Sequence, residues 1–429
     1  MLNSASISAV NAAKFSQRFV RPLYDSYCFS HLPATIDFLL TGHTSQMLPR
    51  DVLGNLPTRY DTVIFFFIDA FGWRFFERYA EKYPFLKTVS SQGVVSKLTS
   101  QFPSTTAAHV TCMHTGLNVG QSGVYEWNYY EPLVDDIISP LIFSYAKDKT
   151  LRDTVKNASI SPTQFFPSQT FYQTLQSRGV RSHILQNQSY TPSTYSDIVF
   201  RGARVYPYTT LHGALATLTD LLINKPITQT APAYYFFYFD RIDTICHNHG
   251  PFSQQFDEGV DKFLTALDQA FYKAVQGKTG KTLFMMSADH GQVEVDPRKT
   301  YYLNRQMPSI TRYLKTNKRA HLLVPAGSAR DMFLHVKDEC VDRLVNELRH
   351  RLAGRAEVYR TSDLLAQHFF GLQPPSQFLL DRIGNVVIVP YKYETVWWYE
   401  EGTFSMHFYG HHGGLTPEEM EVPLLVLPL

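Results

Sequence analysis

The sequence is poor in cysteine, and it has no long hydrophobic run. Four cysteines are spread over 429 residues with no CxxC spacing, which argues against a secreted disulfide framework. No apolar stretch approaches the roughly 18 residues that a membrane-spanning helix needs, so we expect no membrane span. The first residues lack a basic segment followed by an apolar core. Together with the few cysteines, this favours a cytoplasmic protein.

The sequence also lacks a charge excess of either sign. Forty Lys and Arg stand against 38 Asp and Glu, so no global positive field would draw the chain to a nucleic-acid duplex. Hydrophobic residues make up 44% and aromatic residues 14%, which excludes a disordered, collagen-like or coiled-coil protein. The length suits two or three domains, or one large α/β domain with an insertion. Nothing predicts the oligomeric state.

Three continuous apolar runs predict a mostly parallel central sheet. Each run is followed by an aspartate: 63–68 and 234–239 directly by Asp69 and Asp240, and 282–286 by Ser287-Ala288-Asp289. Such runs suit strands covered on both faces, and the helical stretches that follow (71–79 and 255–275) favour an α/β sheet sandwiched by helices. Ligands bind beyond the carboxyl ends of such strands, so the aspartates mark the expected functional edge.

The character of the sequence changes at residues 296–404, which predict an inserted, smaller α+β cap. Stretches within 331–336, 356–359 and 384–389 alternate like half-exposed strands, with a helix at 339–352. The remaining parts are then an α/β core with an N-terminal wrap (1–295) and a return to the core (405–429) that closes with a strand at 422–427.

Aspartates and histidines gather in three short segments after or between predicted strands. Asp243 and His247 are spaced i, i+4, which places them on one face of a helical turn and suits zinc. Asp289 and His290 follow a strand, and of the adjacent His411 and His412 we expect only one to face a site. Asp69 alone would be an ordinary turn or cap residue, but the segments together favour a metal site.

A hydroxyl cluster, Ser104-Thr105-Thr106, precedes a predicted helix at 107–114. One interpretation is an ordinary helix N-cap. The other is a hydroxyl at a helix N-terminus, where backbone N–H groups and the helix dipole favour an anion such as phosphate. The local sequence does not decide between them.

In this order, the segments resemble the alkaline phosphatase superfamily, and most of all its type I phosphodiesterase/nucleotide pyrophosphatase branch. The motifs are Phe-Phe-Ile-Asp69, Phe-Pro-Ser-Thr-Thr106 with Thr115-Gly116, Asp243-x-x-x-His247-x-x-Gly250-Pro251, Ala-Asp289-His290-Gly291 and Gly410-x-His412-Gly413. The resemblance implies an alkaline phosphatase-like fold, a hydrolase of phosphoric ester or phosphoanhydride bonds, and a small-molecule phosphoester or nucleotide as substrate.

The resemblance also implies two zinc ions, with manganese as the alternative metal. One ion would be held by Asp243, His247 and His412. The other would be held by Asp69, Asp289, His290 and the hydroxyl of Thr106. Thr106 would be the nucleophile and form a phosphothreonine intermediate, with Thr105 as the fallback.

The chain departs from the family pattern beside the nucleophile. Related phosphodiesterases have Pro-Asn after it, where this chain has Ala107-Ala108-His109. Their phosphate-binding asparagine aligns with Trp127 by gapless counting, and Asn128 is next to it. Trp127, Asn128 and Thr105 are therefore our candidate substrate-binding residues.

Other functions remain open on the same residues. No arginine stands beside Thr106, which favours a diester or nucleotide pyrophosphate over a monoester, although an arginine such as Arg241 could reach in. A phosphomonoesterase, phosphonate hydrolase or phosphomutase on the same scaffold is the alternative enzyme. A non-catalytic binding module is the alternative from another class, and the presence of the full ligand set argues against it.

Overall fold

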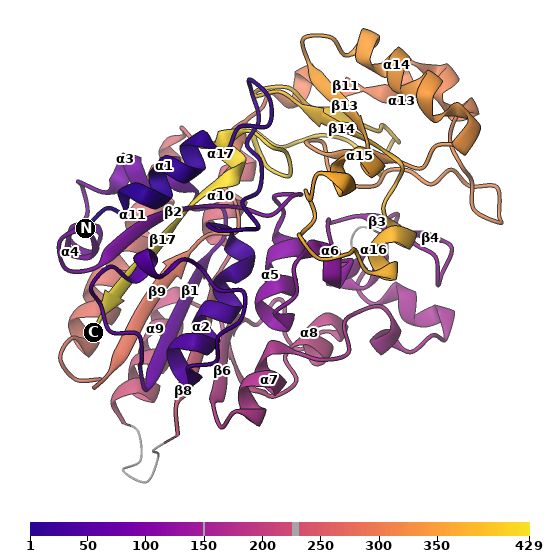
Figure 1. Ribbon diagram of the computed structural model, residues 1–429. Helices are drawn as coiled ribbons and strands as arrows, with labels where there is room; N and C mark the ends of the chain where they lie inside the picture. Colours follow the sequence, from indigo (N-terminus) through magenta and orange to yellow (C-terminus); the bar gives the residue numbers. More distant parts are fainter. Residues whose placement is uncertain (149–150, 225–230) are drawn as a thin grey trace.

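A seven-stranded sheet with helices on both faces forms the core of this computed structural model (Figure 1). The structure describes residues 1–148, 151–224 and 231–429. The strand order is β2-β17-β9-β1-β8-β6-β7. These strands are β1 (Thr62–Ile68), β2 (Val94–Thr99), β6 (Arg181–Asn187), β7 (Ala203–Tyr208), β8 (Ala233–Phe239), β9 (Thr282–Ser287) and β17 (Glu421–Pro428).

The predicted, mostly parallel sheet is confirmed, with one antiparallel strand. β1 pairs in parallel with β8 and β9, and all seven of its residues are buried, as its unbroken apolar run requires. β17 runs antiparallel to both β2 and β9. Because the preceding residues 410–416 lie at the carboxyl edge of the sheet, the chain can only enter β17 from that edge and run back.

Helices cover both faces of the sheet (Figure 1). The longer ones are α1 (Ser4–Ala12), α2 (Leu32–Thr41), α3 (Trp73–Tyr79), α4 (Pro84–Gln92), α5 (Thr106–Thr115), α7 (Phe171–Ser177), α9 (Leu211–Ile223), α10 (Arg241–His249) and α11 (Gln254–Ala266). The helical stretch predicted at 255–275 is confirmed, and it consists of α11, a π-helical segment at Leu267–Tyr272, and α12 (Lys273–Val275).

The loops after β1 and β9 pack against each other without room for side chains. A Cβ atom on Gly72 would lie 2.5 Å from the Cα of Gly291. This close approach, together with the direct pairing of β1 and β9, brings Asp69 and Asp289 next to each other at the carboxyl edge.

A smaller three-stranded antiparallel sheet lies in the later part of the chain, with order β12-β14-β13. It consists of β12 (Met332–Leu334), β13 (Ala356–Arg360) and β14 (Val386–Pro390), with α14 (Val341–Arg351) beside β13. The expected half-exposed alternation is wrong for β12 and β14, which are wholly buried. β14 is the central strand: Val386 and Ile388 belong to a separate hydrophobic cluster, whereas Val387 and Val389 belong to the main core. The boundaries 296 and 404 stay a prediction.

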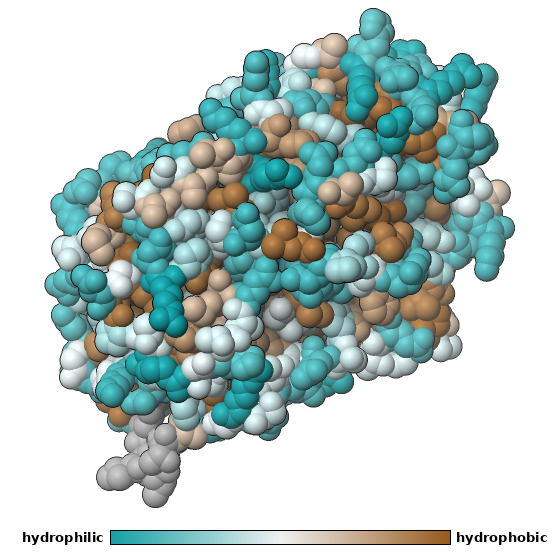
Figure 2. Space-filling model, viewed as in Figure 1, coloured by the Kyte–Doolittle hydropathy of each residue, from teal (hydrophilic) through white to brown (hydrophobic). Residues whose placement is uncertain are grey.

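The surface is mainly hydrophilic on the face shown in Figure 2. Hydrophobic side chains stand out near α16 (Gln377–Arg382), where Leu372, Phe378 and Leu380 are exposed. Scattered apolar side chains of this kind are ordinary on a folded protein. Among the described residues, no helix combines the length and the hydropathy needed to cross a membrane.

Candidate active site

Six of the predicted metal-site residues meet at the carboxyl edge of the central sheet. Each follows or belongs to an element that ends there: Asp69 follows β1, Asp243 and His247 lie on α10 after β8, Asp289 and His290 follow β9, and His412 follows β16 (Gly410–His411). The edge is where open α/β sheets bind their ligands. The structure therefore brings together side chains from four distant parts of the chain.

The ligand atoms form two overlapping groups, within each of which they lie no more than 4.8 Å apart. One group is Asp69, Asp289 and His290, and the other is Asp243, His290 and His412. Nε2 of His247 lies 3.3 Å from Oδ1 of Asp243, and Nε2 of His412 lies 3.8 Å from the same oxygen. His290 thus lies between the two sets into which the resemblance divides these residues.

The three histidines are held in one tautomer by backbone carbonyls. Nδ1 of His247 donates to the carbonyl oxygen of Gly410 (2.7 Å). Nδ1 of His290 donates to that of Gly291 (2.9 Å), and Nδ1 of His412 donates to that of Ser104 (3.0 Å). Nδ1 therefore carries a proton in each ring, and Nε2 faces the carboxylates. This is how metal-binding histidines are oriented by their surroundings.

Gly410 is what allows His247 to reach the carbonyl oxygen of residue 410. A Cβ atom there would lie 2.6 Å from the carbonyl oxygen of Cys246, so only glycine lets β16 come this close to α10.

Of the adjacent histidines, only His412 joins the cluster. His411 lines the neighbouring cavity, and its Nδ1 accepts the backbone N–H of His412 at 2.9 Å.

Burial governs the protonation of the cluster. It raises the pKa of Asp69 and Asp243, and it lowers the pKa of His412 so that this imidazole is neutral at pH 7. Burial also acts to raise the pKa of Asp289, but the adjacent His290 outweighs it, and the pKa falls to about 2. Asp289 is therefore the most firmly ionised carboxylate of the site.

The cluster fits a divalent cation. Oδ2 of Asp289 is fully buried and has no hydrogen-bond partner among the described residues. Nε2 of His290 lies 3.2 Å away, so the two atoms could share one cation. A buried, unsatisfied carboxylate oxygen is costly unless a cation or donor meets it. Three carboxylates and three imidazoles are a donor set suited to zinc.

Other hydrogen bonds orient the carboxylates. The hydroxyl of Tyr238 donates to Oδ2 of Asp69 at 2.5 Å, and the backbone N–H groups of Ala70 and His290 donate to Oδ1 of Asp289 at 3.0 Å each. Nε2 of Gln292 donates to Oδ1 of Asp243 at 2.5 Å. Sequence reasoning missed Tyr238 and Gln292, because a single polar group in or after a buried strand gives no pattern.

Thr106 faces this cluster and Thr105 does not. Thr106 is the first residue of α5, and its Oγ1 lies 3.2 Å from Nε2 of His290 and 3.4 Å from Oδ1 of Asp69. Oγ1 of Thr105 donates instead to the carbonyl of Tyr125 at 3.0 Å. The hydroxyl at the start of α5 is thus placed beside the carboxylates and imidazoles, where the helix N-terminus also favours an anion.

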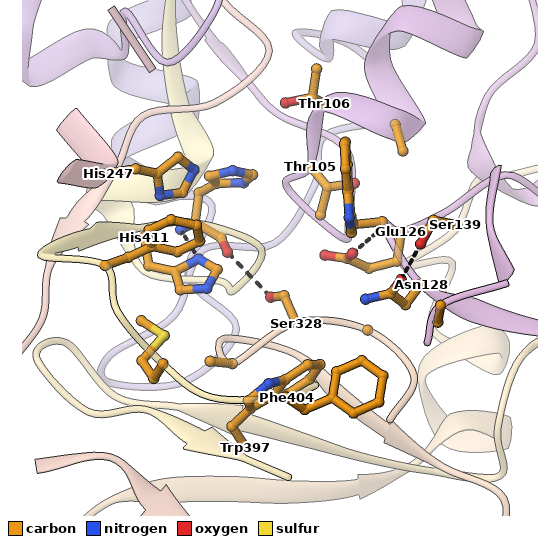
Figure 3. A pocket seen from close by; sticks show the side chains of 18 of the residues that line it. Thr105, Thr106, Glu126, Asn128, Ser139, His247, Ser328, Trp397, Phe404 and His411 are labelled. Carbon is orange, nitrogen blue, oxygen red and sulfur yellow. Dashed lines mark hydrogen bonds between the residues drawn. The ribbon is translucent and has the colours of Figure 1, made fainter. Parts of the chain in front are cut away.

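Two cavities meet at Thr106. The larger, about 490 Å³, is shown in Figure 3, with Thr105 and Thr106 on one side, His247 and His411 on another, and Trp397 and Phe404 below. The smaller, about 210 Å³, is lined by residues that include Arg152, Gln186, Tyr190 and Asp240. Thr106, Trp127 and Asp243 line both. A group bound at Thr106 could therefore extend into either cavity.

The candidate substrate residues lie at these cavities. Oδ1 of Asn128 accepts from the hydroxyl of Ser139 at 2.6 Å, which leaves the amide nitrogen turned toward the larger cavity (Figure 3). Trp127 is 46% exposed and lies between the two cavities. Arg241 is exposed and lines neither, whereas Arg152, which sequence reasoning missed, lines the smaller one. Arg152 stands in a loop without a motif, so no sequence signal pointed to it.

The sequence matches the family model described as type I phosphodiesterase/nucleotide pyrophosphatase over residues 63–414. The chain belongs to this family. Structurally it resembles murine ectonucleotide pyrophosphatase/phosphodiesterase 5, with a TM-score of 0.59, 16% identity, and coverage of 85% of this chain and 87% of that one.

An inactive variant of the same murine protein, in complex with AMP, matches equally well, with a TM-score of 0.59 at 16% identity over 85% of this chain and 87% of that chain. The human protein matches with a TM-score of 0.58 at 17% identity over 85% and 87%. At such identities the likeness shows the fold. A search of curated proteins by sequence gives no match.

Proposed function

We propose that the protein is a zinc-dependent hydrolase of phosphodiesters or nucleotide pyrophosphates, with Thr106 as its nucleophile. The observation that carries this proposal is the position of Oγ1 of Thr106, 3.2 Å from Nε2 of His290 inside a cluster of three aspartates and three histidines. Family membership supports the same class of reaction.

Two zinc ions would be held by the residues that the resemblance assigns. Asp243, His247 and His412 would hold one, and Asp69, Asp289, His290 and the hydroxyl of Thr106 the other. When bound, the ions supply Lewis acidity, which lowers the pKa of a bound hydroxyl and offsets charge on phosphate oxygens.

The chain itself supplies the nucleophile and the orientation. Oγ1 of Thr106 loses its proton and attacks phosphorus, the bond to the leaving oxygen breaks, and the departing alcohol takes up a proton. Water then hydrolyses the phosphothreonine, so the net reaction is diester plus water to monoester plus alcohol. Backbone N–H groups at the start of α5 and the amide of Asn128 would bind the non-bridging phosphate oxygens.

The cavities favour a diester over a monoester. A dianionic monoester calls for cationic side chains around the phosphate, and among the described residues that line the larger cavity there is no Lys or Arg. Arg152 is on the far side, at the smaller cavity. The region predicted to be a cap lines the larger cavity with Gly327, Ser328, Trp397 and Phe404. This position supports a role for the region in substrate selection.

The test is a comparison of bis-p-nitrophenyl phosphate with p-nitrophenyl phosphate, combined with zinc counting by elemental analysis. We expect about two zinc ions per chain, faster turnover of the diester, and loss of both zinc and activity on dialysis against a chelator. Faster turnover of the monoester would favour the phosphomonoesterase alternative. Absence of both zinc and turnover would contradict the enzyme and favour a binding module.

A further inference from the structure

Two buried carboxyl groups, Glu126 and Asp331, meet in the wall of the larger cavity. Glu126 is 1% exposed and lines the cavity, and Asp331, which directly precedes β12, is fully buried behind it within hydrogen-bond contact. They come from distant parts of the chain. Neither belongs to the cluster of Asp and His side chains described above.

No basic side chain of the described residues forms an ion pair with either group. The two buried arginines are already paired: Arg330 binds Glu419, and Arg382 binds Glu131. Glu126 accepts the backbone N–H of Trp127, and Asp331 accepts the backbone N–H (3.1 Å) and the hydroxyl of Ser328 through Oδ1.

One carboxyl oxygen of the pair lacks a hydrogen-bond partner among the described residues. This oxygen is Oδ2 of Asp331, which is buried. Burial raises the pKa of both groups, that of Glu126 to about 7. Two adjacent buried carboxyl groups with so few donors need either a shared proton or a cation. Near neutral pH a cation that reached Glu126 could take the place of the proton.

The cavity in front of Glu126 is built for an organic cation. In Figure 3 Glu126 lies across the cavity from His247 and His411. Trp127, Trp397 and Phe404 supply aromatic walls. Burial lowers the pKa of His411, so this imidazole adds no positive charge at pH 7. A carboxylate beside aromatic faces is the surrounding that ammonium groups prefer.

We propose that the larger cavity binds an ammonium group on one substituent of the substrate, with Glu126, backed by Asp331, as its counter-charge. The inference rests on the proposed function and names its substrate class: phosphodiesters with an aminoalkyl substituent. Glu126 is then a specificity-determining residue, while Thr106 and the Asp and His cluster act on the phosphorus that all diesters share.

The test compares two esters that differ only in charge: 2-aminoethyl methyl phosphate and n-propyl methyl phosphate, in which CH₃ replaces NH₃⁺. Each is used as a competitive inhibitor of bis-p-nitrophenyl phosphate hydrolysis by the zinc-loaded protein. We expect the ammonium ester to bind at least about tenfold more tightly. In Glu126→Gln the ratio of the two inhibition constants should fall to near one. Equal constants in the unchanged protein would overturn the proposal.

Asp240→Asn is the matched control. Asp240 is also an acid beside the site, but it lines the smaller cavity and accepts the hydroxyl of Tyr190 at 2.6 Å. Its loss should leave the ratio of inhibition constants unchanged. An equal fall in both variants would mean a general field effect and would overturn a specific role for Glu126.

Two further measurements separate the remaining outcomes. Metal counting by elemental analysis shows whether Glu126→Gln loses one bound metal ion. Such a loss would mean that Glu126 binds a metal ion and not an ammonium group, and it would overturn the proposal. If bis-p-nitrophenyl phosphate is not hydrolysed at all, the proposed function fails. Calorimetric binding of the two esters still compares their affinities in that case, so the two failures can be told apart.

Discussion

Nε2 of His290 lies 3.2 Å from Oγ1 of Thr106, although His290 follows β9 and Thr106 begins α5. The contact exists because Nδ1 of His290 donates to the carbonyl of Gly291, which turns the other nitrogen toward the hydroxyl. An imidazole nitrogen, a hydroxyl and the Asp69 carboxylate thus converge at the start of α5.

Tyr238→Phe should weaken metal binding with little effect on folding. The variant removes the hydroxyl that donates to Asp69 at 2.5 Å and keeps the ring. Loss of such an orienting hydrogen bond costs about ten- to a hundredfold in metal affinity or activity. Competition with a zinc chelator measures the affinity. Tyr208→Phe is the control, since that buried hydroxyl donates to the backbone carbonyl of Tyr238 in β8 and not to Asp69; an equal loss in both variants would contradict the role given to the Tyr238 hydroxyl.

Arg330→Met should release the loop that carries His412. Arg330 and Glu419 are a fully buried pair, joined at 2.9 Å. Glu419 also accepts the backbone N–H groups of Gly414 at 3.0 Å and Thr416 at 3.2 Å. Removing one partner of a buried pair costs about 3–5 kcal/mol of unfolding free energy. We expect lower stability, by denaturant unfolding, together with weaker zinc binding.

Arg382→Met supplies the matched comparison for that variant. Arg382 forms an equally buried pair with Glu131, and its other hydrogen bonds go to the carbonyls of Gly123 and Phe165. We expect a similar loss of stability but normal zinc affinity in the molecules that remain folded. Normal zinc affinity in Arg330→Met as well would contradict a positioning role for Arg330.

Glu126→Gln should change how the stability of the metal-free protein depends on pH. Burial raises the pKa of Glu126 from 4.5 to about 7. Between these values the folded state binds more protons than the unfolded chain, so this group lowers stability as pH rises, by up to about 3 kcal/mol above pH 7. A glutamine at this position does not ionise, so it does not lower the stability as the pH rises. The variant should therefore gain unfolding free energy over the unchanged protein between pH 5 and pH 8, and parallel pH profiles would contradict the shifted pKa.

Much of the fold could be predicted because buried parallel strands leave a plain pattern. The apolar run of β1 marks both the strand and its end at Asp69, and the same holds for β9 and Asp289. β14 was misjudged because its two faces pack in two different hydrophobic clusters, and one strand's sequence does not show what covers it.

The site could be predicted only as far as its residues lie in short motifs. Asp243 and His247 share a helical spacing, and Asp289 and His290 are adjacent. The contacts between Glu126 and Asp331, and between Arg330 and Glu419, join residues that are far apart in the chain and follow no periodicity. Such pairs appear only when the chain is folded. The choice between Thr105 and Thr106 also required the structure, because two neighbouring hydroxyls in one sequence cluster differ only in the direction in which they point.

The most direct test of the central claim compares Thr106→Ala with Thr105→Ala, both zinc-loaded, on bis-p-nitrophenyl phosphate. We predict that Thr106→Ala loses turnover by at least about a thousandfold while it keeps its zinc, since only this hydroxyl faces the cluster. Thr105→Ala, which loses a hydrogen bond to the carbonyl of Tyr125, should retain substantial turnover. Undiminished turnover by Thr106→Ala would contradict the account.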